Sequence, residues 1–186
     1  INLALSGDRV NYDGEFYKLR DFRLGVKSQR DHIPIFIASI GRKNVELTGE
    51  LADGWAPIYV SPKYMDKFKV WLSDGASRSG RSSDAIEVRP YTLACVSDDV
   101  GLARALARGH LAFYIGGMGR YYHDLVSRYG FVEEATAIKE FFTKHEQGKA
   151  ADAVTDAMLS ELTVIGTAEE CRQQIVDLQE AGMGSP

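Results

Sequence analysis

Apolar residues gather in three short runs, and each run is followed by a segment with helical spacing. The runs cover residues 34–40, 53–59 and 86–96. The first run has bulky apolar residues without polar alternation, which is typical of a strand buried on both faces of a parallel sheet. Because Pro90 cannot donate an amide hydrogen, it must lie near the beginning of the third strand or at an edge. Repeated strand–helix units predict an α/β protein.

The helices predicted between these strands carry their own start signals. Residues 43–52 place four residues on one helical face: Val45, Thr48, Leu51 and Ala52. Ser61 is followed by Pro62, the order expected for an N-cap and a first helical position, so we expect a helix to residue 73. Residues 75–84 are rich in Ser, Gly and Arg and are expected to form a loop.

The second half of the chain is predicted to be mainly helical. We expect a helix from Ser97 or Asp98 to residue 113, and a break at Tyr114-Ile-Gly-Gly-Met-Gly119. Further helices are predicted at residues 121–129, 133–145 and 149–161, followed by a short connector at 162–166. The capping box Thr167-x-x-Glu170 then opens a last helix, which Gly182 ends.

Composition and charge argue against several classes of function for this protein. The chain has 186 residues with 22 Lys and Arg against 26 Asp and Glu, so no basic excess is available to neutralise nucleic-acid phosphates. No apolar run approaches the span of a bilayer, so we expect no membrane partner. Cys95 and Cys171 lie far apart with no Cys/His cluster, which argues against a metal site. We interpret both as small buried residues of a cytoplasmic protein.

The best candidate for a binding site follows the first predicted strand. In parallel α/β folds ligands bind at the carboxyl ends of strands, here at residues 38–42, 59–61 and 96–99. Small residues in Ala38-Ser39-Ile40-Gly41 allow close backbone approach, and free amides at the following helix start attract an anion. Ser39 adds a hydroxyl, while Arg42 and Lys43 add positive charge. The pattern predicts a site for a phosphate-bearing cofactor; a plain tight turn with solvated basic residues is the alternative.

Two other features have weaker functional interpretations. Trp55 could flank a planar ring, but packing into the core is the favoured interpretation. Tyr114 and Met118 could line a channel, or their segment could simply be a flexible break between helices; its glycines do not match the dinucleotide fingerprint. No pair of histidines has metal-ligand spacing, and no Ser, His and acid set can be assembled, so no catalytic residue is assigned.

Several of these segments together resemble the C-terminal half of luciferase-like monooxygenases, and more narrowly their coenzyme F420-dependent branch. The segments are Pro34-Ile-Phe-Ile-Ala-Ser-Ile-Gly41, Lys43-Asn-Val-x-Leu-Thr-x-Glu-x-Ala-Asp-Gly-Trp55, Ser61-Pro62, Tyr114-Ile-Gly-Gly-Met-Gly119, Tyr129-Gly130, Gly166-Thr167 and Tyr12-x-Gly14-x-x-Tyr17. The resemblance covers nearly the whole chain. One departure is Arg42, which stands where that branch usually has proline.

The resemblance implies an incomplete (β/α)8 TIM barrel, because a full barrel takes about 250 residues. The three predicted strands would be the fifth, sixth and seventh, and the eighth would begin just after Met183. We therefore expect one partial domain over residues 1–186. Its parts would be a loop leading to the fifth strand (1–33), barrel βα units (34–98), a helical insertion (99–161) and the final barrel helix (162–186).

The resemblance also implies a flavin- or F420-dependent oxidoreductase, with hydride transfer or oxygenation at the carboxyl mouth of the barrel. Coenzyme F420, or alternatively FMN, would place its phosphate on the backbone of Ala38, Ser39, Ile40 and Gly41. The acid/base candidates of the family lie in the half that this chain lacks. A small-molecule substrate and a homo-oligomer are expected for the full-length protein. A non-catalytic barrel partner without cofactor, or another phosphate-ligand TIM-barrel enzyme, remains the alternative.

Overall fold

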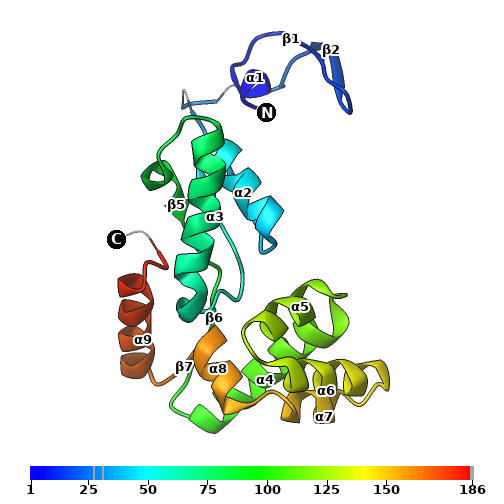
Figure 1. Cartoon of the computed structure of the whole chain (residues 1–186), viewed down its shortest axis with the longest axis vertical. Coiled ribbons are helices and arrows are strands. Elements are labelled where there is room, and N and C mark those ends of the chain that lie inside the picture. Colours follow the sequence, from blue (N-terminus) through cyan, green and yellow to red (C-terminus); the bar gives the residue numbers. More distant parts are fainter. Residues whose placement is uncertain (27, 31, 185–186) are drawn as a thin grey trace. The chain divides into compact units, whose positions relative to one another are not determined.

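The computed structural model describes residues 1–26, 28–30 and 32–184. The chain divides into two compact units, Ile1–Ile35 and Phe36–Pro186 (Figure 1). The candidate site predicted at residues 38–41 belongs to the second unit.

The first unit is a short helix followed by a two-stranded hairpin. Helix α1 spans Asn2–Leu5, and the antiparallel strands are β1 (Val10–Asp13) and β2 (Lys18–Phe22). The hairpin turns at Asp13-Gly14, where the Gly14 amide donates to the Tyr17 carbonyl at 3.0 Å. The expected loop over residues 1–33 therefore contains a short helix and two strands.

The first sheet of the second unit confirms the predicted parallel order. Strands β3 (Phe36–Ile37), β4 (Gly54–Trp55) and β5 (Glu87–Val88) are all parallel, with β4 in the centre. The ladder extends past β4 through a bridge between Ile58 and Tyr91. Each strand is shorter than its predicted run.

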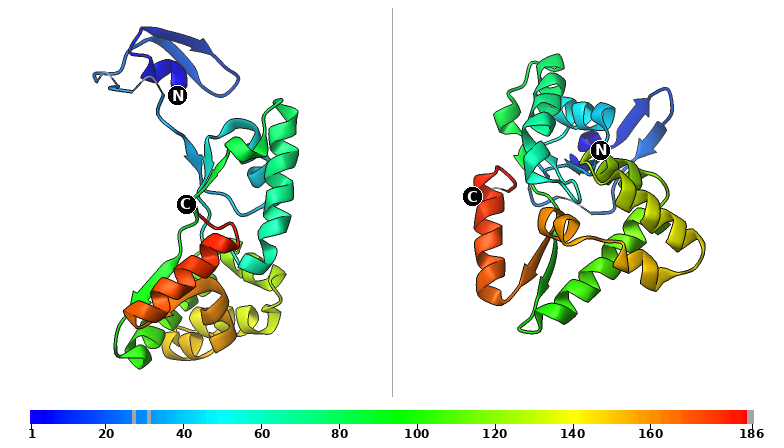
Figure 2. Two further views of the ribbon diagram at one scale, coloured as in Figure 1. Left: turned by 90° about the vertical axis from the view of Figure 1, so that its left-hand side faces the viewer. Right: turned by 60° about the horizontal axis from the view of Figure 1, so that its bottom comes forward.

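The third predicted strand, residues 86–96, is divided into two at Pro90. Its first part is β5, and its second part is β6 (Leu93–Val96), which pairs in parallel with β7 (Thr163–Gly166). The prediction of a plain connector at 162–166 is therefore wrong. Helices α4 (Val100–Gly117) and α9 (Ala168–Glu180) both pack against the β6–β7 pair (Figure 2). Among the described residues the strands form open sheets and no closed barrel, in agreement with an incomplete barrel. The eighth strand expected after Met183 would fall on Gly184 and on residues 185–186, which lie outside the described residues.

Helices α2 (Arg42–Leu51) and α3 (Met65–Arg78) pack against each other beside the first sheet. Val45, Thr48 and Ala52 are buried as predicted, but Leu51 is exposed. Helix α3 is preceded by a 3-10 turn, η1 (Pro62–Tyr64), and continues beyond residue 73 through Gly75. The loop predicted over residues 75–84 is wrong at its start, because α3 continues to Arg78. Gly75 lies inside this helix, where it meets the backbone of Glu46 and no side chain would fit. A second 3-10 turn, η2 (Ser83–Ala85), precedes β5.

Four of the remaining helices, α5 to α8, pack against α4 (Val100–Gly117). Its N-cap is Asp99, whose carboxylate accepts from the Leu102 amide at 3.0 Å, rather than the predicted Ser97 or Asp98. The predicted break at Tyr114 was also wrong, since α4 runs on to Gly117. A Cβ added to Gly116 would lie 2.6 Å from the Phe142 Cβ, so this glycine serves close helix packing. The other helices are α5 (Tyr121–Arg128), α6 (Val132–Thr143), α7 (Gln147–Asp152), α8 (Asp156–Leu162) and α9 (Ala168–Glu180).

The helix predicted over residues 149–161 is interrupted, because α7 ends at Asp152 and Thr155 caps α8. The capping box of Thr167 and Glu170 at the start of α9 is confirmed, and Gly182 follows with a left-handed φ of 82°. One continuous apolar core joins α2 to α8. Its largest fully enclosed members include Trp55, Tyr59, Met65, Leu111, Ile115 and Met158.

Candidate functional site

The predicted turn at residues 38–41 leads from the carboxyl end of β3 into α2. Ala38 is exposed, Ile40 and Gly41 are half-buried, and Ser39 is buried. A Cβ added to Gly41 would meet nothing within 4 Å, so the backbone of this turn can be approached closely. The structure thus brings the four predicted residues together at the strand end where ligands of parallel α/β proteins bind.

Ser39 is directed into the protein rather than toward solvent. Its hydroxyl lies 2.9 Å from the Thr48 hydroxyl, and its carbonyl accepts a 2.8 Å hydrogen bond from the Trp55 indole. The Thr48 hydroxyl already donates to the Asn44 carbonyl at 2.7 Å, so Ser39 must be the donor to Thr48. In this arrangement the groups that the turn offers to a ligand are backbone amides.

The first turn of α2 supplies three such amides. Gly41 is the N-cap, and its carbonyl accepts the first helical bond, from the Val45 amide at 2.9 Å. In the described part of the chain, the amides of Arg42, Lys43 and Asn44 have no acceptor, and the first turn carries no acidic residue. Unpaired amides at a helix start, aided by the helix dipole, are suited to an anion.

Arg42 does not turn its charge toward these amides. Its guanidinium is bonded to the Glu46 carboxylate at 2.6 Å and lies 3.9 Å from Asp74 of α3. Glu46 is buried and also accepts from Arg78 at 2.6 Å, and these two guanidinium groups lower the pKa of its carboxyl below the usual range. Arg42 therefore joins α2 to α3, which differs from the predicted phosphate contact, while Lys43 is exposed.

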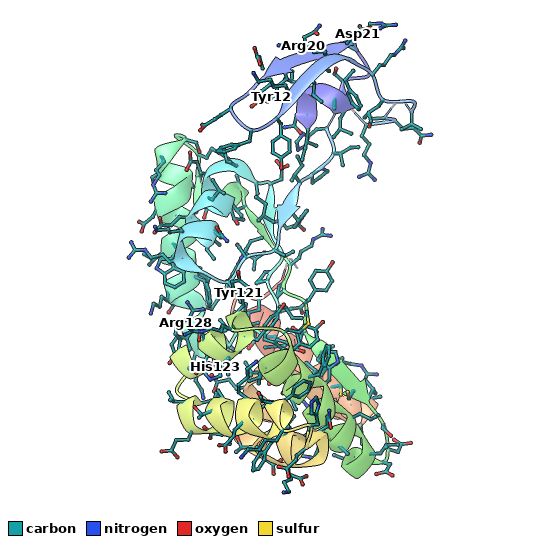
Figure 3. All side chains as sticks on the ribbon, turned by 90° about the vertical axis from the view of Figure 1, so that its right-hand side faces the viewer. Tyr12, Arg20, Asp21, Tyr121, His123 and Arg128 are labelled. Carbon is teal, nitrogen blue, oxygen red and sulfur yellow. The ribbon has the colours of Figure 1, made fainter. Side chains whose placement is uncertain are left out.

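A second guanidinium comes to the turn from far along the chain. Arg128, the last residue of α5, donates to the Ile40 carbonyl at 3.3 Å and is exposed (Figure 3). On the same helix, His123 lies 3.2 Å from the Asp124 carboxylate, with Tyr121 largely exposed. Arg128 thus places a positive charge beside residues 38–41. The sequence pattern gives no signal for it, since 88 positions separate the two residues.

The carboxyl end of β4, the second predicted place, holds a buried aromatic group instead of a ligand pocket. Tyr59 has a left-handed φ of 54°, which is uncommon for a residue other than glycine. Its ring packs edge-on against Tyr114 and Tyr122, and its hydroxyl has no hydrogen-bond partner among the described residues. Burial raises the pKa of the Tyr59 phenol above its usual range. Trp55 is fully buried against Phe68, so the core interpretation of Trp55 is confirmed.

The segment that follows Tyr59 is hydrogen-bonded to α8 through a nearly buried carboxylate. Glu161 accepts from the Ser61 hydroxyl at 2.5 Å and from the Lys63 ammonium at 2.6 Å. Lys63 and Glu161 border a cavity of about 510 Å³ that Tyr129 and Phe131 also line. Ser61 is therefore bonded to Glu161 and makes no side-chain cap to the helix that follows. The sequence pattern gives no signal for Glu161 either, because 100 positions separate it from Ser61.

At residues 96–99, the third place predicted for a ligand, Ser97 and Asp99 are already engaged in hydrogen bonds within the protein. The Ser97 hydroxyl accepts from the Asp99 amide, and the Ser97 amide donates to the Gly166 carbonyl at 2.9 Å. Asp99 is itself occupied as the N-cap of α4. The Tyr114–Gly119 segment is mostly helical, so it does not form the loop that either interpretation required.

Other kinds of site find no support in the described residues. Among the residues that the structure describes, no group of three or more His, Cys, Asp or Glu side chains could hold a metal ion. Cys171 is buried, Cys95 half-buried, and both thiols are free. In the described ranges 1–26, 28–30 and 32–184, no helix is long and apolar enough to cross a bilayer.

Comparison with known proteins gives matches over most or all of the chain. A protein of Mycobacterium tuberculosis named as a coenzyme F420-dependent oxidoreductase is 30% identical over 160 residues, covering 83% of this chain and 46% of the relative. The 5,10-methylenetetrahydromethanopterin reductase of Archaeoglobus fulgidus is 33% identical over 196 residues, covering 100% of this chain and 58% of the relative. The chain thus spans about half the length of these curated relatives.

Solved structures agree with the sequence matches. The coenzyme F420-dependent tetrahydromethanopterin reductase of Methanopyrus kandleri superposes with a TM-score of 0.80 at 25% identity, covering 98% of this chain and 52% of that one. An F420-dependent secondary alcohol dehydrogenase superposes with a TM-score of 0.72 at 21% identity, covering 98% and 50%, which supports the fold alone. The family model described as luciferase-like monooxygenase matches residues 1–185. The chain therefore belongs to the luciferase-like monooxygenase family.

Proposed function

We propose that this chain forms the cofactor-binding part of an F420-dependent oxidoreductase. The family, and relatives whose names specify coenzyme F420, support the class. Under this proposal the phosphate of the cofactor binds at Ala38, Ser39, Ile40 and Gly41, with the amides of the first turn of α2 as donors. FMN is the alternative cofactor, and its phosphate would use the same amides.

The observation that carries the proposal is the set of unpaired amides at the start of α2. A phosphate group needs several donors, and the first turn of α2 offers three amides without an acceptor and contains no acidic residue. The open space at Gly41 leaves the backbone accessible, while the bond from Trp55 to the Ser39 carbonyl holds the turn in place. The residues present therefore fit an anionic cofactor tail.

The chemistry of the reaction would come from the bound cofactor, which donates or accepts a hydride. The part played by this chain is to bind and orient. The α2 amides fix the anionic end, and the Arg128 guanidinium adds a positive charge at the rim of the same turn. The substrate is proposed to be a small organic molecule, and no residue of this chain is assigned a proton-transfer step.

The proposal is tested by placing a carboxylate on the helix start. Gly41→Asp should cap α2 and keep or raise its stability, because Asp is a favoured N-cap, yet it should weaken F420 binding by at least about tenfold through repulsion of the phosphate. Binding is measured by fluorescence titration of F420, using the full-length protein. Gly41→Asn is the matched control, since it caps the same amides without charge and should weaken binding less.

Equal F420 affinity in the Gly41→Asp variant and the unchanged protein would reject this phosphate site. Failure of the full-length protein to oxidise reduced F420 with any substrate, despite tight binding, would instead favour the non-catalytic barrel partner. The two results separate the location of the cofactor from the enzymatic role.

A further inference from the structure

A cavity of about 510 Å³ lies where η1, the end of α5 and helix α8 meet. Pro62, Tyr129 and Phe131 give it apolar walls, two of them aromatic, and Lys63 and Glu161 give it polar groups. Pockets of this size and mixed lining take small organic molecules. Among the described residues that line it, none belongs to the phosphate-binding turn after β3, so the cavity is a second candidate site.

The charges in this cavity cancel. Lys63 and Glu161 are the only charged residues among those described at its wall, and they are bonded to each other at 2.6 Å. The Glu161 side chain is only 7% exposed, whereas the Lys63 side chain reaches solvent. A charged occupant would add an unbalanced charge in a partly buried place, which is costly. The cavity therefore favours an uncharged molecule.

Glu161 can accept further hydrogen bonds. One of its carboxylate oxygens accepts from the Ser61 hydroxyl, and the other accepts from the Lys63 ammonium. Because a carboxylate has about four lone-pair sites, each oxygen keeps room for a second donor. A donor on a ligand can thus be bound without breaking either existing bond.

Tyr129 offers the complementary group. The residue is only 8% exposed, and its ring centroid lies 4.7 Å from that of Tyr64. In the part of the chain that the structure describes, the Tyr129 hydroxyl has no hydrogen-bond partner. Burial raises the pKa of this phenol, and the nearby Ser61 amide lowers it. Because an amide N–H can only donate, Ser61 leaves the phenol proton without an acceptor, which costs free energy until a ligand supplies one.

We propose that this cavity binds an uncharged ring compound that carries a hydroxyl group. A hydroxyl can accept from Tyr129 and donate to Glu161 with the same oxygen atom, which satisfies both groups at once. The ring would lie along the walls formed by Phe131 and Pro62. An anion would be placed beside the Glu161 carboxylate, and a cation would compete with Lys63. The proposal does not depend on the cofactor, because the phosphate-binding turn supplies none of these groups.

The test is a titration of the cofactor-free full-length protein, followed by saturation-transfer NMR, with four probes that share one ring. Benzyl alcohol carries the neutral hydroxyl, toluene carries no polar group, benzoate carries a negative charge and benzylammonium a positive charge. We expect benzyl alcohol to bind with a dissociation constant of about 1–10 mM. Each of the other three probes should bind at least about fivefold more weakly.

Two tyrosine variants provide a matched pair. Tyr129→Phe removes only the phenol oxygen, so it should weaken benzyl alcohol binding by at least about fivefold and leave toluene binding unchanged. Tyr59→Phe is the control, because the Tyr59 hydroxyl is also buried without a partner among the residues described, but Tyr59 does not line this cavity. Neither variant should lower the melting temperature, since neither loses a hydrogen bond within the protein.

A third variant tests the balance of charge. Lys63→Met leaves the nearly buried Glu161 carboxylate without its cation. The variant should therefore bind benzylammonium at least about fivefold more tightly than the unchanged protein does. No gain for benzylammonium would show that Glu161 does not face the occupant, and would overturn the proposal.

Several other results would also overturn it. One is the absence of saturable benzyl alcohol binding, and another is tighter binding of toluene, benzoate or benzylammonium to the unchanged protein. Equal effects of Tyr129→Phe and Tyr59→Phe on benzyl alcohol would remove Tyr129 from the site. A lower melting temperature of Tyr129→Phe alone would show that its hydroxyl already has a partner. Fluorescence titration of F420 should be unchanged in Tyr129→Phe, so failure of this cavity and failure of the phosphate site are distinguishable.

Discussion

The side-chain amide of Gln174 is hydrogen-bonded to both backbone polar groups of Ile165. Its Oε1 accepts from the Ile165 amide at 3.1 Å, and its Nε2 donates to the Ile165 carbonyl at 2.9 Å. A residue of α9 thus takes the place that a neighbouring strand would occupy along β7. An edge that is satisfied in this way cannot recruit another strand at that position.

Replacing Gln174 with leucine should leave both Ile165 groups without partners. We expect the free energy of unfolding to fall by about 1–3 kcal/mol, as is usual for orphaned, partly buried polar groups. The measurement is urea denaturation followed by circular dichroism. Gln173→Leu is the control, because Gln173 is exposed and bonds only to Asp177 within the same helix. Equal effects of the two substitutions would contradict this role of Gln174.

The paired arginines around Glu46 predict a dependence of stability on pH. Because Arg42 and Arg78 lower the pKa of this carboxyl in the folded chain, the stabilisation is present above the unfolded pKa, near 4.5, and is lost as the pH falls through the lower folded pKa. Glu46→Gln should therefore lower the melting temperature by a few degrees at pH 7. The difference from the unchanged chain should shrink in acid. A constant difference from about pH 7 down to about pH 3 would exclude this origin.

Gly75 allows α3 to approach the backbone of α2 at Glu46. A Cβ here would clash with the Glu46 carbonyl, and a backbone atom cannot move aside as a flexible side chain can. We expect Gly75→Ala to destabilise the chain by at least about 2 kcal/mol, measured by thermal unfolding. Gly148→Ala on α7 should be neutral or stabilising, since nothing lies near its Cβ position. A tolerated Gly75→Ala would mean that the two helices pack less closely than described.

Ser39 and Thr48 share one buried hydrogen bond. Replacing each partner in turn distinguishes a direct from an indirect role of Ser39 in cofactor binding. Ser39→Ala in the full-length protein should weaken F420 binding several-fold, because the turn loses its tie to α2. Thr48→Val breaks the same bond while leaving Ser39 in place. If Ser39 acts by positioning the turn, both variants should weaken binding to a similar extent in a fluorescence titration. A normal Thr48→Val with a weak Ser39→Ala would indicate direct contact, and two normal variants would remove Ser39 from the site.

Local patterns were enough to predict much of the fold. The capping box at Thr167 and the spacing of Val45 and Thr48 are decided by residues a few positions apart, and the helices they indicate are present. Pro90 was recognised as a constraint on its strand, but its effect depends on which strands lie on each side. Strand β7 was missed because four residues between two helices carry too little periodicity to distinguish a strand from a connector.

The candidate site could likewise be predicted only where neighbouring residues decide the structure. The turn from Ala38 to Gly41 could be predicted, because strand, small residues and helix start follow one another directly. Arg128 and Glu161 could not, since their partners Ile40 and Ser61 lie 88 and 100 positions away and only the packing of the helical layer brings them close. The burial of Ser39 likewise depends on Thr48 facing inward, which residue type alone does not reveal.

The parallel pairing of β6 with β7 has a consequence for how the chain acquires its structure. All of α4 to α8 lies between the two strands, so their ladder must wait until that long segment has compacted. The intervening helices rely on local contacts and can form earlier. While a ribosome is still producing residues 163–166, β6 has no partner for its backbone groups. During synthesis of this region β6 therefore exposes unpaired backbone groups for a time, and a strand in this state is a target for a chaperone.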